Sequence, residues 1–242
     1  MNKFPRSAYV HIPFCHRRCF YCDFAVIPLG NKVETLQGYG SKTVKEYLHF
    51  LYKEILSIKH KSPLSTIYVG GGTPSILDPQ QIKQLIDLFK ENYGVDYGAE
   101  ITMEVDPASF NLDDLHGFIN AGINRFSLGV QSFNNQILQK AGRRHLREDA
   151  EKSCLWLKKV YSAGLIKSWS LDLIQNLPLS GFREWKEDLN KAITFSPPHI
   201  SIYDLNIENG TVFKKLVNLG KLQLPSDEEA FRNSESTHLI LK

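Results

Sequence analysis

The chain has 242 residues, of which 42% are hydrophobic and 23% charged, a composition typical of globular proteins that excludes a disordered or fibrous one. Its 29 basic and 26 acidic residues give a net charge of +3, too small for the positive field that nucleic-acid binding requires, so we expect no nucleic-acid partner. The sequence has no apolar run long enough for a transmembrane segment and no secretory signal, which predicts a cytoplasmic protein.

Six apolar, β-branched or aromatic runs alternate with segments of helical periodicity, a pattern that predicts an α/β fold with a parallel sheet. The predicted strands are residues 8–12, 66–69, 100–105, 125–130, 169–174 and 199–205. The predicted helices are residues 43–58, 79–89, 112–120, 148–163 and 183–194. Six βα units are too few to close an eight-stranded barrel, so we expect an open, partial TIM-like barrel with its functional residues on the loops that follow the strands.

The end of the chain differs from this pattern. Residues 1–229 are expected to form one core domain, whereas residues 230–242 are polar and add no further βα unit. We therefore expect residues 230–242 to be a short divergent tail and a candidate for disorder.

Three cysteines directly follow the first predicted strand. Cys15, Cys19 and Cys22 have the spacing C-x3-C-x2-C. Cysteine thiolates hold iron–sulfur clusters, and three of them on a [4Fe-4S] cluster leave one iron open to the amino and carboxylate groups of S-adenosylmethionine (SAM). Transfer of an electron from such a cluster into the sulfonium would split a C–S bond and yield methionine and a 5′-deoxyadenosyl radical.

A structural zinc site is the alternative interpretation of these cysteines, with His11 or His16 as the fourth ligand. Structural zinc sites usually come as paired, more tightly spaced knuckles, and no second knuckle follows in the sequence. Cys154 lies in an apolar helical stretch and is expected to be a small buried residue.

The second predicted strand ends in Gly70-Gly71-Gly72-Thr73-Pro74. Glycines at the carboxyl end of a strand let a ligand approach the backbone closely, but an ordinary tight turn explains such a run equally well. No Gly-Lys-Ser/Thr follows, which excludes a phosphate-binding P-loop. Because it comes one strand after the cysteines, this loop is a candidate for binding the methionine moiety of SAM.

Polar residues also end the later predicted strands. Glu104, Gln131 and Arg143 lie at or after strand ends, and Asp172 is embedded in an apolar strand, where a carboxylate is costly unless it is paired or bound to a ligand. Any one of these residues is more often a helix cap or part of a salt bridge. Their occurrence at successive strand ends favours a common site.

Together these motifs make the chain resemble the oxygen-independent coproporphyrinogen III oxidase family of radical SAM proteins, and in particular its heme chaperone HemW branch. The resemblance extends over residues 7–229. It rests on Tyr9-Val10-His11-Ile12-Pro13-Phe14-Cys15, Cys22-Asp23-Phe24, Gly70-Gly71-Gly72-Thr73-Pro74, Gly129-Val130-Gln131-Ser132-Phe133, Gly142-Arg143, Asp172-Leu173-Ile174 and Glu208-Asn209-Gly210-Thr211.

The resemblance implies a [4Fe-4S] cluster bound by Cys15, Cys19 and Cys22, and SAM as a second cofactor. The positions that match SAM contacts of the family are Tyr9, Tyr21, Gly71, Gly72, Thr73, Glu104, Gln131, Arg143 and Asp172. In the oxidase some of these positions serve a second SAM, and the number of SAM molecules bound here stays open.

The sequence departs from the family pattern at three places. The oxidase has another cysteine two residues after the third ligand, whereas this chain has Phe24, as the chaperone-like relatives do. The C-terminal region of the chaperone branch, with its heme-binding motif, does not occur before Lys242, which makes the chain look truncated. Asn176 stands where relatives usually have a glycine, and asparagine tolerates a left-handed turn.

Three functional hypotheses follow. The first is a HemW-type heme chaperone that binds heme and transfers it to apo-hemoproteins. The second is an enzyme that oxidatively decarboxylates coproporphyrinogen III, which Phe24 disfavours. The third is a truncated fragment that keeps the core without any activity.

Overall fold

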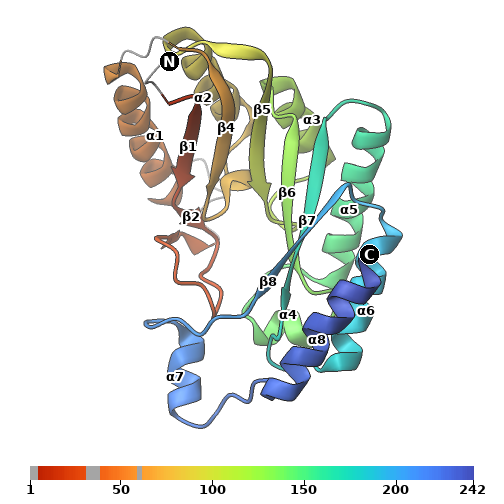
Figure 1. Ribbon diagram of the computed structural model, residues 1–242. Coiled ribbons are helices and arrows are strands. Elements are labelled where there is room, and N and C mark those ends of the chain that lie inside the picture. Colours follow the sequence, from red (N-terminus) through yellow and green to blue (C-terminus); the bar gives the residue numbers. More distant parts are fainter. Residues whose placement is uncertain (1–4, 31–38, 59–61) are drawn as a thin grey trace.

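The computed structural model describes residues 5–30, 39–58 and 62–242 and has a single six-stranded sheet at its centre (Figure 1). All six predicted strands are confirmed. The strand order is β1-β4-β5-β6-β7-β8, and every neighbouring pair is parallel. The strand bounds are Ser7–Ile12 for β1, Leu64–Gly71 for β4, Val95–Val105 for β5, Arg125–Gln131 for β6, Ser168–Gln175 for β7 and His199–Asp204 for β8.

Because β1 and β8 form the two edges of the sheet, the barrel is partial and open, as expected. The five predicted helices are also confirmed, and Figure 1 shows them on the outer side of the curved sheet. Their bounds are Tyr39–Ser57 for α1, Pro79–Asn92 for α2, Leu112–Ala121 for α3, Arg147–Ser162 for α5 and Phe182–Thr194 for α6.

The two faces of the sheet differ in chemistry, because side chains alternate along each strand. The face toward the helices is apolar and includes Val69, Met103, Phe126 and Trp169, all fully buried in the main core. The residues on the inner face of the sheet are mostly polar or tyrosine. They include Tyr9, Tyr68, Glu104, Ser127, Asp172 and Tyr203. An eight-stranded barrel fills its interior with apolar side chains, whereas this open barrel keeps a polar interior.

Local sequence fixes where the helices begin and end. Asp78 caps α2 by accepting a hydrogen bond from the backbone N–H of Gln81, and Asn111 caps α3 in the same way through Asp114. Gly122 ends α3 in the left-handed conformation, with a φ of 110°.

Several short elements escaped the sequence analysis. They are β2 (Phe14–Cys15), β3 (Ile27–Pro28), a 3-10 turn at Pro74–Ile76, α4 (Asn135–Lys140) and α7 (Val212–Asn218). Each is too short to show a periodic apolar pattern. They matter because α4 and α7 contribute to a second apolar cluster, which includes the fully buried Phe213 and packs against Phe20 of the cysteine loop.

The expected disorder of residues 230–242 is wrong. Residues Asp227–Ile240 form helix α8, which begins at a capping box on Ser226 and packs against α6. The indole Nε1–H of Trp185 donates to the hydroxyl of Thr237 over 2.9 Å. The polar composition misled the prediction because α8 docks through hydrogen bonds rather than through an apolar stripe.

Asn176 confirms the expected left-handed turn, with a φ of 64°. The side-chain N–H of Asn176 donates to the carboxylate of Asp204 over 2.6 Å, and the side-chain oxygen of Asn176 accepts from the side-chain amide of Asn233 over 2.8 Å. The side chain of Asn176 therefore links the end of β7 to β8 and α8.

Among the described residues, no helix combines the length and apolar character that crossing a bilayer requires.

We predict that Asn233→Ala lowers the free energy of unfolding by about 1–3 kcal/mol, because it leaves the buried carbonyl oxygen of Asn176 without its donor. Urea denaturation of the purified chain measures this change. Glu235→Ala, at an exposed position of the same helix, is the control and should change stability by less than about 0.5 kcal/mol. Equal effects of the two substitutions would refute the proposed role of Asn233.

Candidate functional site

The loop that carries the cysteines is closed by a small backbone clasp. The short strands β2 and β3 pair in parallel, and the N–H groups of Ile27 and Leu29 donate to the carbonyls of Pro13 and Cys15 over 2.6 and 2.8 Å. The clasp brings the two ends of the loop together, so residues 15–28 project as a unit from the carboxyl end of β1.

The glycine run at the end of β4 is hydrogen-bonded to the backbone that leads into this loop. The N–H groups of Gly72 and Thr73 donate to the carbonyls of Ile12 and Phe14 over 2.8 and 2.7 Å. A Cβ at Gly72 would lie 2.6 Å from the carbonyl oxygen of Phe14 and 2.9 Å from the Sγ of Cys15. Gly72 is therefore required for close approach of the glycine turn to the cysteine loop.

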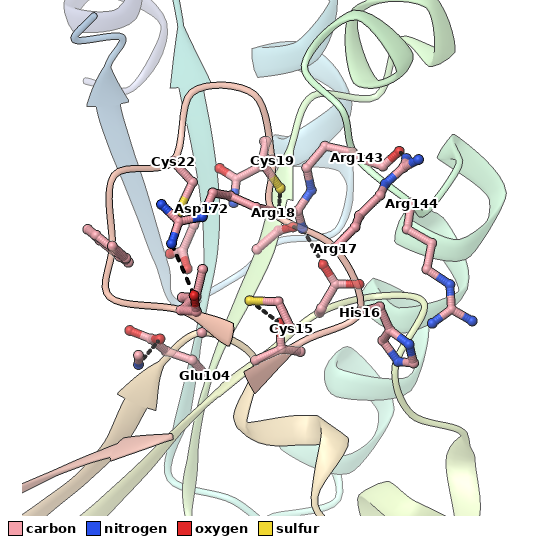
Figure 2. Close-up of a pocket in the computed structure, with 18 of the residues that line it drawn as sticks. Cys15, His16, Arg17, Arg18, Cys19, Cys22, Glu104, Arg143, Arg144 and Asp172 are labelled. Atoms are coloured by element: carbon pink, nitrogen blue, oxygen red, sulfur yellow. Dashed lines mark hydrogen bonds and ion pairs between the residues drawn. The ribbon is translucent and has the colours of Figure 1, made fainter. Parts of the chain in front are cut away.

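The three cysteines are free thiols that line one pocket of about 300 Å³ (Figure 2). The Sγ of Cys15 accepts a hydrogen bond from the hydroxyl of Thr73 over 3.5 Å, and the Sγ of Cys19 accepts one from Arg143 over 3.5 Å. Burial raises the pKa of Cys15 to about 11 and also raises the pKa of Cys22. Metal binding must therefore displace protons from these sulfurs.

The arrangement fits an iron–sulfur cluster better than a single zinc ion. In the described part of the chain, no three His, Cys, Asp or Glu side chains lie close enough together to hold one metal ion. Tetrahedral zinc requires all its ligands about 2.0–2.3 Å from one centre. A multi-iron cluster is larger and can join thiolates that surround a pocket without touching one another.

Arg143 is the central cation of the site and joins three segments. It forms an ion pair with Asp106 after β5, and its Nη2–H donates to the carbonyl of Gly129 on β6 over 2.8 Å. Its Nη1–H reaches both Cys19 and the hydroxyl of Tyr21 over 3.5 Å. Although burial opposes ionisation, Arg143 holds the pKa of Asp106 below its usual value, so both partners remain charged.

Glu104 lies in the same pocket and holds two hydrogen bonds. The hydroxyl of Tyr68 donates to its Oε1 over 2.8 Å, and the N–H of Gly71 donates to its Oε2 over 3.1 Å. Burial raises the pKa of Glu104 despite these two donors. The residue thus links the polar interior of the barrel to the glycine turn.

Asp172 is buried on β7 and incompletely paired. The hydroxyl of Ser127 donates to its Oδ2 over 2.6 Å, whereas Oδ1 has no hydrogen-bond partner. Burial raises the pKa of Asp172. Gln131 also presents an unpaired, buried Oε1, and its φ of 68° is strained for a residue with a side chain. The Oδ1 of Asp172 and the Oε1 of Gln131 are thus two unpaired acceptors in one pocket, and they suit a polar ligand with hydrogen-bond donors, such as SAM.

The structure brings together almost all the residues predicted for the site. The pocket is lined by Cys15, Cys19, Tyr21, Cys22, Gly71, Gly72, Thr73, Glu104, Gln131, Arg143 and Asp172. Tyr9 is the exception, because it does not line this pocket. It lies on the open inner face of β1, 60% exposed, with its hydroxyl 3.0 Å from Nδ1 of His11.

Tyr68 and Ser127 were not among the residues predicted for the site, and Asp106 was not predicted to contact SAM. Asp106 directly follows β5, and the fact that it follows the same strand as Glu104 was the available signal. Tyr68 and Ser127 offered no signal in the sequence, because tyrosine and serine are common in strands. Their roles depend on contacts with Glu104 and Asp172 across the sheet.

Known proteins that are similar in sequence and structure identify the family of this chain. The model of the Radical SAM superfamily matches residues 9–171. The chain belongs to the radical SAM superfamily. Membership implies a [4Fe-4S] cluster and SAM, and the pocket chemistry described above fits both.

Curated relatives include several heme chaperones. The chain is 41% identical over 227 residues to heme chaperone HemW of Synechocystis sp., covering 93% of this chain and 53% of the relative. It is 34% identical to HemW of Escherichia coli, and the match covers 98% of this chain and 59% of that relative. It is 33% identical to the mitochondrial radical S-adenosyl methionine domain-containing protein 1 of Danio rerio, and the match covers 92% of this chain and 48% of that relative. The chain thus spans about half the length of these relatives.

Among solved structures, coproporphyrinogen III oxidase (HemN) from Escherichia coli superposes with a TM-score of 0.82 at 30% sequence identity, covering 98% of this chain and 52% of HemN. Streptococcus suis SuiB bound to S-adenosylmethionine matches with a TM-score of 0.59 at 13% identity, which supports the fold alone.

We predict that Asp106→Asn lowers the free energy of unfolding of the radical SAM core by about 3 kcal/mol, because it leaves the buried guanidinium of Arg143 without its counter-ion. Chemical denaturation of the chain without metal measures the loss. Glu91→Gln, at an exposed position near the end of α2, removes the same charge and should be nearly neutral. If Asp106→Asn leaves the free energy of unfolding unchanged, the ion pair contributes little to stability.

His145 gives a pH prediction. Burial lowers its pKa to about 4, and its Nε2–H donates to the carbonyl of Val130 over 3.0 Å. The pKa of His145 is about 6.5 in the unfolded chain and about 4 in the folded chain, so between these pH values the unfolded chain binds a proton that the folded chain does not. The free energy of unfolding therefore falls as the pH drops from about 6.5 to about 4, by about 3 kcal/mol in total. His145→Gln should remove this part of the slope in denaturation curves measured between pH 4 and 7. An unchanged slope would contradict the prediction.

Proposed function

We propose that this chain is the cluster- and SAM-binding core of a HemW-type heme chaperone, which binds heme and transfers it to apo-hemoproteins. The observation that carries the proposal is the convergence of Cys15, Cys19 and Cys22 on one pocket whose other walls present Arg143 and Asp172. The identity of 41% to a heme chaperone supports the assignment to this branch.

Cys15, Cys19 and Cys22 would hold the cluster through their thiolates. When bound, the cluster supplies one electron to the sulfonium of SAM. The residues of the chain bind and orient SAM: the glycine turn offers a close backbone approach, and the free oxygens of Asp172 and Gln131 accept hydrogen bonds. The free thiols require a reducing compartment, and we propose the cytosol.

Heme binding is supported by the mouth of this pocket as well as by the relatives. Phe24 and Tyr203 line the pocket and are 60% and 57% exposed, so they offer apolar surface to a flat macrocycle. Phe24 also occupies the position where the oxidase of the family has a further cysteine.

Oxidation of coproporphyrinogen III is the second candidate, favoured by the TM-score of 0.82 with HemN. Phe24 weighs against it. Under this alternative, a substrate radical would lose carbon dioxide from a propionate side chain.

The test is anaerobic reconstitution of the chain with iron and sulfide. We expect about four irons per chain, and less than about a tenth of that in a variant with all three cysteines changed to serine. Cys154→Ser is the matched control and should retain full iron, because Cys154 is buried in α5, away from the pocket. Zinc in place of iron, or iron that survives the triple substitution, would refute the cluster assignment.

The two candidate functions are then separated with the reconstituted chain. Hemin titration followed by addition of apomyoglobin should show saturable binding and transfer. Incubation with coproporphyrinogen III, SAM and dithionite should yield no decarboxylated product. Accumulation of protoporphyrinogen would instead establish the oxidase.

A further inference from the structure

The backbone bends sharply at the end of β6. The N–H of Ser132 donates to the carbonyl of Val130 over 2.9 Å, and Gln131 between them has a φ of 68°. A hydrogen bond from residue i+2 to residue i around a positive φ is the rare, strained form of γ-turn. The pairing of β6 with β7 also shifts in register between Gly129 and Gln131, and such irregularities redirect side chains at strand ends.

This γ-turn of residues 130–132 determines where the side chain of Gln131 lies. Its Oε1 is buried without a partner, and the residue lines the same pocket as the three cysteines. A Cβ added at Gly129 would lie 3.0 Å from Nε2 of Gln131 and 3.6 Å from Nη2 of Arg143, so both side chains lie against the backbone of Gly129. A hydrogen-bond acceptor of the pocket is therefore placed by a backbone conformation that a regular strand does not adopt.

Asp188 holds this turn from the neighbouring helix. It lies on α6 and is only 3% exposed. Its Oδ2 accepts from the hydroxyl of Ser132 over 2.6 Å, and its Oδ1 accepts from the N–H of Phe133 over 2.7 Å. The Oγ of Ser132 in turn accepts from the N–H of Asn134, the cap of α4, over 3.0 Å. Both carboxylate oxygens thus bind the two residues that directly follow Gln131.

The conformation of the γ-turn and the burial of this carboxylate are both costly. A strained residue persists only where the surrounding structure fixes it, and a buried carboxylate persists only where hydrogen bonds compensate for lost water. Burial raises the pKa of Asp188 to about 6, although its two hydrogen bonds act in the opposite direction. On the other side of the turn, the Nε2–H of His145 donates to the carbonyl of Val130 over 3.0 Å. Buried side chains therefore fix the γ-turn at both ends.

We propose that Asp188 is a positioning residue for SAM, which acts through the γ-turn that fixes the side chain of Gln131 in the pocket. The inference rests on the proposed function, because it assumes that SAM binds in this pocket and donates a hydrogen bond to Gln131. Asp188 does not line the pocket itself, so its effect on the ligand is transmitted by the turn. Without its carboxylate, the backbone of Gln131 relaxes from the positive φ and the Oε1 acceptor moves.

The experiment is a double-mutant cycle on SAM binding. Equilibrium dialysis measures the dissociation constant of SAM for the anaerobically reconstituted chain, at equal iron content in every variant. We expect Gln131→Ala and Asp188→Ala each to raise this constant by about fivefold or more. In the Gln131→Ala background, Asp188→Ala should raise it by less than about twofold, because the group through which Asp188 acts is gone. A general loosening of the fold would instead weaken binding equally in both backgrounds.

A second variant covers the case in which Asp188→Ala does not fold. Ser132→Ala removes one of the two hydrogen bonds to Asp188 and introduces no new polar group. It should raise the dissociation constant of SAM by about threefold, and this effect should also disappear in the Gln131→Ala background. Glu187→Ala is the matched control, because it removes an exposed carboxylate from the preceding position of α6. It should change SAM affinity by less than about twofold.

A second readout needs no cofactor. In the cofactor-free chain, hydrogen exchange of the Phe133 amide should be about tenfold faster in Asp188→Ala, because this N–H loses its acceptor. Exchange of the Leu128 amide, within β6 and before the turn, should stay unchanged. The comparison separates a local release of the turn from a loss of overall stability.

The outcomes separate the two proposals. Failure of SAM to bind the unchanged, cluster-loaded chain refutes the proposed function. SAM binding that Gln131→Ala leaves intact, or that Asp188→Ala and Ser132→Ala weaken equally in both backgrounds, overturns the positioning role and leaves the proposed function standing. Unchanged exchange of the Phe133 amide in Asp188→Ala overturns the positioning role as well.

Discussion

The parallel direction of all six strands is the constraint on which the site depends. Parallel strands bring their carboxyl ends to the same edge of the sheet, so the loops after β1, β4, β5, β6 and β7 meet there. The cysteine loop, the glycine turn, Asp106 and Arg143 come from different βα units, yet they line one pocket because of this shared direction. The site therefore requires the complete sheet rather than any local motif.

Within the pocket, one buried cation organises the opposing charges. Arg143 connects the end of β5, the backbone of β6 and the cysteine loop, so its guanidinium makes the relative positions of these segments interdependent. Its ion pair with Asp106 lines the same pocket as the three thiols.

The openness of the barrel has a chemical consequence. With two strands fewer than a closed barrel, the inner face of the sheet stays accessible, and polar residues and tyrosines can occupy positions that a closed barrel fills with aliphatic side chains. Glu104 and Asp172 are two such polar residues and line the pocket, and the hydroxyl of Tyr68 donates to Glu104. The strands carry the apolar core on their other face, so stability and ligand binding occupy opposite sides of one sheet.

The sequence by itself determined the six strands, five of the longer helices and the close spacing of the three cysteines, because strand and helix periodicities and the C-x3-C-x2-C spacing are local properties. It also anticipated the left-handed turn at Asn176, since few residues tolerate that conformation. Only the tertiary structure decided the remaining features. Helix α8 forms at a tail whose polar composition hid its docking on α6, Tyr9 lies outside the pocket, and Tyr68 and Asp106 became site residues through contacts with groups more than thirty positions away. Such contacts depend on how distant segments pack, and no local pattern encodes that packing.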